Sequence, residues 1–148
     1  MPFAAQAPVA YPAATFAMHH YREAELCRRI DAASPHQLVG LLYEGAHAAL
    51  LAAGMATASQ QASVRLRSVT RAMAILDSLD QSLDHAQGGR VAAALALAYA
   101  QVRTLIVAGN GERRRDLIDA AAAQLRILGD SWAAIAPSVT TARNRSGA

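Results

Sequence analysis

The sequence has 148 residues, a formal net charge of +3 and a hydrophobic content of 53%, with only 5% aromatic residues. This length fits one domain with a core of its own, so neither disulfides nor metals are needed to stabilise it. The alanine-rich, aromatic-poor composition favours closely packed helices over a β-sandwich. The 14 basic residues are all arginine and are scattered, which argues against a nucleic-acid-binding face.

Cys27 is the single cysteine, which excludes an intrachain disulfide and a thiolate metal cluster and fits the reducing cytoplasm. Residues 1–15 carry no basic residue, unlike a signal peptide, and no apolar run free of charge is long enough to cross a membrane. We therefore expect a soluble, cytoplasmic protein without membrane insertion.

Residues 1–17 are rich in alanine and proline and have no apolar periodicity, so they are predicted to form a flexible arm. A helical domain is expected over residues 18–136, followed by a disordered tail over 137–148. Its first element is a short helix from His19 to Ile30, with Tyr21, Leu26 and Ile30 on one side.

The next helix has a sharply defined start. Ser34 and Gln37 have the spacing of a capping box, and Pro35 suits the first helical position because its fixed φ matches a first turn. This helix is expected to run to about Ala58. The residues predicted to form its apolar stripe are Leu38, Leu41, Leu42, Gly45 and Ala46.

Three more helices follow, predicted over Ala62–His85, Arg90–Ala108 and Glu112–Ala136. The breakers between and after them are Gln87-Gly88-Gly89, Gly109-Asn110-Gly111 and Pro137. Their predicted seams include Leu66, Val69, Met73 and Leu76, then Val91, Leu95 and Val102, then Ile118, Leu125, Leu128 and Trp132. The fold class expected is all-α: an antiparallel up-and-down four-helix bundle with a short extra N-terminal helix.

The usual catalytic motifs are missing from the sequence: it has no glycine-rich phosphate loop, no Cys-x-x-Cys and no His-Glu-x-x-His. Glu44 and His47 have the Glu-x-x-His spacing of bundle di-iron sites, but a second such motif is absent, so a solvent-facing His47 is expected. Asp77, Asp80 and Asp84 are interpreted as a solvated acidic strip, because exposed carboxylates lack the burial that tunes acid–base groups. No functional role is expected for two further features: the Cys27 thiol is predicted to be inert, and Arg113-Arg114-Arg115 is predicted to be a solvated helix turn. We expect no catalytic residue, no metal and no cofactor.

Taken together, these landmarks resemble the FliS family of flagellar export chaperones. The residues that carry the resemblance are Tyr21, Ser34-Pro35, Leu38, Leu41, Leu42-Tyr43-Glu44-Gly45-Ala46, Arg71-Ala72, Ile75, Leu79, Leu83-Asp84, Gly88-Gly89, Leu95, Leu97, Tyr99, Ala108, Asn110, Leu125, Leu128 and Trp132. The chain departs from the family pattern in its long Ala/Pro-rich arm and in having arginine where lysine is usual before Ala72.

The resemblance implies a cytoplasmic, non-enzymatic chaperone. Such a protein binds the disordered C-terminal segment of flagellin, prevents premature polymerisation and delivers the subunit to the type III secretion apparatus. The implied partners are flagellin, a flagellar export gate protein and other flagellar proteins, with a homodimer when free. The alternatives left open are a helical adaptor for another flagellar or regulatory protein, and a small bundle enzyme or metal carrier that bound iron or manganese would reveal.

Site residues follow from the same resemblance. The flagellin groove, or its support, is expected at Leu42, Tyr43, Leu97 and Tyr99, for which ordinary core packing is the alternative. Met18 and Tyr21 are expected to dock on the export gate or to cover the empty groove, or simply to anchor the first short helix. Purely structural roles are assigned to Ser34, Pro35, Gly88, Gly89 and Trp132.

Overall fold

The computed structural model describes residues 34–135. The predicted arm, the short helix from His19 to Ile30 and the predicted tail lie outside these residues. The chain divides after Leu38 into two units, Met1–Leu38 and Val39–Ala148. Of the first unit, only residues 34–38 are described.

These few residues form the start of helix α2 (Pro35–Ala58). The Ser34 side chain accepts a hydrogen bond from the backbone N–H of Gln37 at 3.1 Å, and the Gln37 side chain accepts one from the backbone N–H of Ser34 at 3.0 Å. Each side chain thus satisfies a backbone donor that the helix start would leave unpaired. The predicted capping box is confirmed, with Pro35 at the first helical position.

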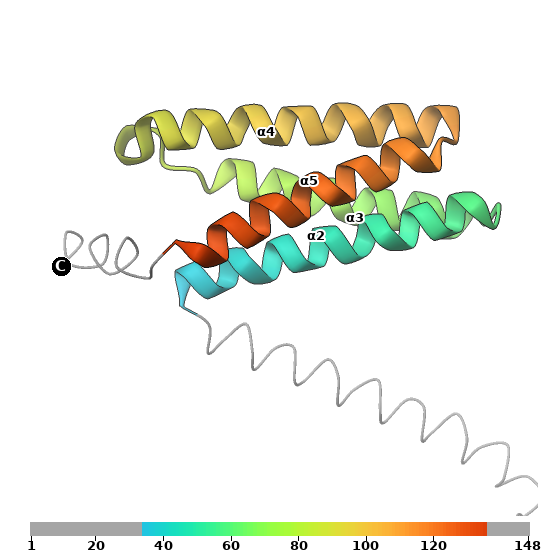
Figure 1. The fold of residues 1–148 in the computed structure, drawn as a ribbon, viewed down its shortest axis with the longest axis horizontal. Coiled ribbons are helices and arrows are strands. Elements are labelled where there is room, and N and C mark those ends of the chain that lie inside the picture. The colour runs from blue at the N-terminus through green and yellow to red at the C-terminus, as the bar shows by residue number, and fades with distance from the viewer. Residues whose placement is uncertain (1–33, 136–148) are drawn as a thin grey trace, which may run out of the picture. The chain divides into compact units, whose positions relative to one another are not determined.

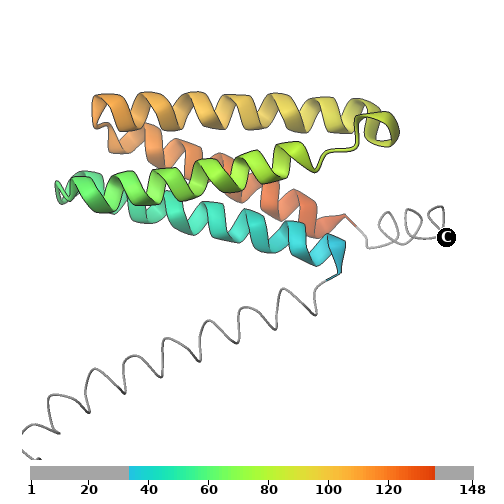
Figure 2. The same cartoon turned by 180° about the vertical axis from the view of Figure 1, so that it is seen from behind.

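The second unit contains the remainder of α2 together with α3 (Ala62–Gln81), α4 (His85–Glu112) and α5 (Arg115–Ala134). Consecutive helices run in opposite directions, as Figures 1 and 2 show. Close contacts join α2 to α3 at Gly45 and Ile75 and α2 to α5 at His47 and Ala122, while α4 packs on both α3 and α5. Helices α2 and α4 are therefore diagonal neighbours, and the predicted antiparallel four-helix bundle is confirmed.

Aliphatic side chains and alanines from all four helices fill the core. The largest side chains that are almost fully buried are Tyr99, Leu50, Leu76, Leu79, Ile106, Ile118, Leu125 and Val102. Each stabilises the fold by about 1.5–3 kcal/mol relative to an exposed position. Alanines at 46, 53, 72, 121 and 122 are buried between them and let the helices approach closely.

The buried face of α2 matches the predicted stripe only in part, since Ala46 is fully buried and Leu42 packs partly buried against the core. Its buried positions include Tyr43, Ala46, Ala49, Leu50 and Ala53, whereas the predicted stripe residue Leu38 is 37% exposed. Apolar residues cover so much of α2 that either of two sides of the helix could be buried. The side chains of α3 and α5 that pack against α2 determine which side it is. For the same reason the predicted seam residues Leu66 and Val91 are exposed.

The boundary between α3 and α4 was also predicted wrongly. Helix α3 ends at Gln81 rather than at His85, and Asp84 starts α4 because its carboxylate accepts a hydrogen bond from the backbone N–H of Gln87 at 3.0 Å. The Gln87-Gly88-Gly89 stretch lies within the bounds of α4, but the backbone of Gly89 is non-helical and separates a short first segment from the long helix, which begins near the predicted start at Arg90. Gly89, with φ of +49°, kinks α4 there.

Gly109-Asn110-Gly111 does not end α4, which continues to Glu112. The Arg65 side chain donates from Nε to Oδ1 of Asn110 at 3.0 Å, which ties this last turn to α3. A Cβ on Gly109 would lie 2.7 Å from Cγ1 of Ile118, so this glycine permits close packing on α5. The helix ends instead at Arg113, in the left-handed conformation with φ of +54°, and α5 begins at Arg115 rather than at Glu112.

Two of the helices, α2 and α4, are long and apolar enough by length and composition to cross a membrane. Both also place residues in the bundle core. Because core helices of soluble proteins pass the same test, this property is weak evidence for a membrane span.

Candidate partner-binding pocket

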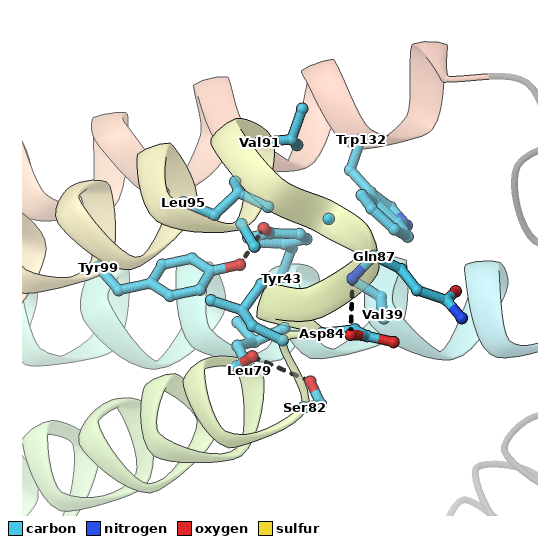
Figure 3. Close-up of a pocket in the computed structure, with 13 residues that line it drawn as sticks. Val39, Tyr43, Leu79, Ser82, Asp84, Gln87, Val91, Leu95, Tyr99 and Trp132 are labelled. Carbon is cyan, nitrogen blue, oxygen red and sulfur yellow. Dashed lines mark hydrogen bonds between the residues drawn. The ribbon is translucent and has the colours of Figure 1, made fainter.

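A pocket of about 440 Å³ opens at one end of the bundle, where the start of α2, the end of α3, the start of α4 and the end of α5 meet (Figure 3). All of its lining residues belong to the unit that begins at Val39. They are Val39, Tyr43, Leu79, Ser82, Leu83, Asp84, Gln87, Gly88, Val91, Ala92, Leu95, Tyr99 and Trp132. Most of these side chains are apolar, so the pocket suits apolar groups of a partner.

Tyr43 from α2 and Tyr99 from α4 form the deepest wall of the pocket. Their hydroxyl groups are hydrogen-bonded at 2.5 Å across the diagonal of the bundle, and their ring centroids lie 6.4 Å apart. Burial raises the pKa of both phenols above the ordinary value, and the hydrogen bond from Tyr43 raises the pKa of Tyr99 further. The pair is therefore neutral and satisfies its own polar atoms beneath an apolar cavity.

The outer part of the pocket is formed by Trp132 of α5, which is half-buried, and by Val91 of α4, which is 63% exposed. Gly88 lies beside them, where an added Cβ would come within 2.9 Å of the Ala92 side chain. At the polar rim, the Asp84 carboxylate is held by the N–H of Gln87. The kinked start of α4 thus gives the pocket both an apolar wall and a charged edge.

The structure brings some of the predicted site residues together and separates others. Tyr43 and Tyr99 meet in the pocket wall, whereas Leu42 packs half-buried against the core and Leu97 is 62% exposed on α4, both outside the pocket lining. Met18 and Tyr21 lie outside the described residues.

Gly88 and Trp132, which were assigned purely structural roles, also line the pocket. Sequence reasoning missed several other apolar lining residues, namely Val39, Leu79, Leu83, Val91 and Leu95. The available signal was their position beside helix ends, close to the Gly88-Gly89 pair.

Several carboxylates and one histidine of the described residues make structural contacts. Among these residues, no three His, Cys, Asp or Glu side chains gather into a metal site. The prediction of a solvent-facing His47 was wrong, since His47 is half-buried and its Nδ1 lies 3.0 Å from the Ala122 carbonyl oxygen. A carbonyl only accepts, so this nitrogen is the donor.

The supposed acidic strip is divided between two roles. Asp77 and Asp80 bind the Arg103 guanidinium of α4 at 2.7 and 3.2 Å, whereas Asp84 caps α4. The strip on α3 is therefore largely neutralised by a neighbouring helix. The triplet Arg113-Arg114-Arg115 is exposed, and Arg114 pairs with Asp116 at 2.6 Å.

The family model described as "Flagellar protein FliS" matches residues 17–139, which is most of the chain. The chain belongs to the FliS family. It is 25% identical over 126 residues to the flagellar secretion chaperone FliS of Salmonella typhimurium, a match that covers 84% of this chain and 93% of that protein. It is 27% identical over 116 residues to the flagellar secretion chaperone FliSB of Pseudomonas aeruginosa, covering 78% and 92%. FliS membership confirms the resemblance drawn from the residues and supports a chaperone role in flagellar export.

Proposed function

We propose that this chain is a cytoplasmic, non-catalytic chaperone for flagellin. It binds the disordered C-terminal segment of flagellin, prevents premature polymerisation and delivers the subunit to the flagellar type III secretion apparatus. Membership of the FliS family and similarity to two proteins named flagellar secretion chaperones support this proposal.

The observation that carries the proposal is the apolar pocket at the bundle end. A disordered segment that folds on binding gives up conformational entropy, so its apolar side chains need a preformed surface that excludes water. A hollow of about 440 Å³ lined by Tyr43, Tyr99, Trp132 and aliphatic side chains offers such a surface. An amphipathic helix formed by the bound segment would place apolar residues in it at intervals of three or four.

We also propose roles for the other residues that were expected in the site. Leu97, exposed on α4, would contact a segment that extends from the pocket along that helix, and Leu42 would support the wall from within the core. Met18 and Tyr21 are proposed to dock on an export gate protein or to cover the empty groove.

The test is calorimetric titration of the full-length chain with a synthetic C-terminal flagellin segment, with helix formation followed by circular dichroism. We expect one-to-one binding, a negative heat-capacity change and a gain of helicity. Absence of binding, with the bundle still folded, would refute flagellin recognition and favour the alternative, an adaptor for another flagellar or regulatory protein.

Two exposed apolar residues provide a matched pair of variants for the pocket itself. Val91→Glu introduces a charge at the pocket wall and should weaken flagellin binding at least tenfold, because a buried unpaired charge is strongly unfavourable. Ile127→Glu is the control, since Ile127 is similarly exposed, at 59%, and lines no described pocket. Equal affinities for both variants would place the binding site elsewhere on the chain.

A further inference from the structure

The hydroxyl groups of Tyr43 and Tyr99, at the deepest wall of the pocket, carry one proton more than their mutual hydrogen bond uses. Burial raises the pKa of both phenols, so both keep their protons. One proton lies between the two oxygens, 2.5 Å apart, and the accepting hydroxyl retains its own whichever of the two donates. In the described part of the chain, neither oxygen makes another hydrogen bond. The second proton is therefore a donor without a protein acceptor.

Two other polar side chains of this region are already engaged. The Asp80 carboxylate accepts a hydrogen bond from Arg103 at 3.2 Å, and its negative charge raises the pKa of Tyr99 although the two side chains are not hydrogen-bonded. The Ser82 hydroxyl, which also lines the pocket, donates its proton to the Leu79 carbonyl oxygen at 2.9 Å. The Ser82 proton is thus used within the chain, whereas the tyrosine pair keeps one donor for whatever enters the pocket.

Water can satisfy this donor only while the pocket is empty. The pocket, of about 440 Å³, has room for water beside the hydroxyls. Tyr43 and Tyr99 are only 2% and 1% exposed, and the side chains around them are mostly aliphatic (Figure 3). A partner that fills the pocket displaces this water, and a donor buried without an acceptor is strongly unfavourable. Tight binding therefore requires the partner to place an acceptor atom against the tyrosine pair.

The charges around the pocket restrict the acceptor to an uncharged oxygen. The Asp84 carboxylate lies at the rim, and the field of Asp80 already acts on Tyr99. A partner carboxylate would lose its hydration and meet two groups of the same charge. An amide, hydroxyl or main-chain carbonyl oxygen avoids both costs. We propose that the pair of Tyr43 and Tyr99 donates one hydrogen bond to an uncharged oxygen of the bound flagellin segment, an inference that rests on the proposed function.

Such a donor gives the pocket a specificity that its apolar walls lack. Apolar walls discriminate weakly between aliphatic side chains, whereas a buried donor rejects a residue that has no acceptor for it. The bound segment must therefore carry one oxygen at the register that reaches the tyrosine pair. A main-chain oxygen serves only near the end of a bound helix, because the other carbonyls of a helix accept hydrogen bonds within it.

Calorimetric titration of the synthetic C-terminal flagellin segment into tyrosine variants of the full-length chain tests the proposal. Tyr43→Phe and Tyr99→Phe each retain one hydroxyl with its proton, so each should bind within about threefold of the wild type. The double variant has no donor and leaves the partner oxygen buried without one, so its affinity should fall by about five- to 150-fold. Circular dichroism and urea titration verify that each variant is folded.

Ser82→Ala is the matched control for these variants. It removes a hydroxyl from the same pocket, but one whose proton is already given to the Leu79 carbonyl oxygen, so affinity should stay near that of the wild type. If the pocket took only apolar groups, the wild type would bury an unpaired donor on binding. The double phenylalanine variant would then bind as tightly as the wild type or more tightly, which would overturn the inference and leave flagellin recognition intact. Absence of binding by the wild type would overturn the proposed function and this inference together.

Replacements in the flagellin segment identify the oxygen and provide a test that needs no change in the chaperone. Each side chain that carries an uncharged oxygen is replaced in turn by an apolar one of similar shape, and main-chain carbonyls near the helix end are weakened as acceptors by ester linkages. One replacement should weaken binding to the wild type about fivefold or more, and a smaller loss with the double phenylalanine variant shows that the same hydrogen bond is involved. A side-chain replacement with this effect assigns the acceptor to that side chain, and an ester assigns it to the main chain. If no replacement of either kind weakens binding to the wild type, the inference is overturned.

Discussion

The buried hydroxyl pair of Tyr43 and Tyr99 makes a testable thermodynamic prediction. Removing one hydroxyl, as in Tyr99→Phe, leaves the other buried and without its partner, which costs about 1–3 kcal/mol. We expect a value near the lower limit, because the adjoining pocket has room for a water molecule beside the remaining hydroxyl. Removing both hydroxyls leaves no orphaned polar group and should be nearly neutral.

A double-mutant cycle measures this difference directly. The free energies of unfolding of the wild type, Tyr43→Phe, Tyr99→Phe and the double variant would be compared by urea titration followed by circular dichroism. The double variant should be less destabilised than the sum of the two single variants by about 1 kcal/mol or more. Additive losses would refute the conclusion that the two hydroxyls satisfy each other.

Three other predictions concern stability. Burial raises the pKa of both pocket tyrosines above the unfolded value of 10.0, so their contribution to the free energy of unfolding is complete below pH 10 and is lost as the pH rises above it. Above pH 10, the free energy of unfolding of the wild type should therefore fall more steeply than that of the double phenylalanine variant. Gly109→Ala should lower the free energy of unfolding by about 1 kcal/mol or more, because the added Cβ would lie too close to Ile118. Gly40→Ala should raise the free energy of unfolding by about 0.5–1 kcal/mol, because no atom lies within 4 Å of the added Cβ. A change of the same sign in both variants would refute the packing argument. Ser34→Ala should cost about 1 kcal/mol in a urea titration through loss of the cap at Gln37, and an unchanged midpoint would contradict that role.

The bundle and the capping box at Ser34 were predicted correctly from the sequence, whereas most helix ends that depend on contacts between helices were not. The capping box at Ser34 depends on side chains three residues apart, so it could be predicted. The end of α4 could not, because Gly109 is required by its closeness to Ile118 of the next helix and not by a turn. Asp84 is a local feature that was nevertheless missed: it fits two interpretations, an extension of α3 or the cap of α4, and its hydrogen bond from the backbone N–H of Gln87 shows that it is the cap.

The residues that line the pocket were also only partly predictable from the sequence. Tyr43 and Tyr99 were both expected at the site, but 56 residues separate them and no periodicity on either helix indicates that their hydroxyls meet. Val91 was assigned to a core seam and is instead exposed at the pocket wall. A surface assembled from four helix ends can be located only when the relative rotation of the helices is known.

The distribution of charge over the bundle explains why α2 and α4 resemble membrane spans. The charged residues of the bundle are concentrated on α3 and α5, for example at Arg67 and Arg71 on α3 and at Arg126 and Asp130 on α5, all of them exposed. Only 22% of the most apolar window of α4 and 33% of that of α2 is buried, so the core does not account for their hydropathy. On α4 the exposed residues between Arg90 and Glu112 carry no charge, which is what a surface needs if it is to pack against another chain.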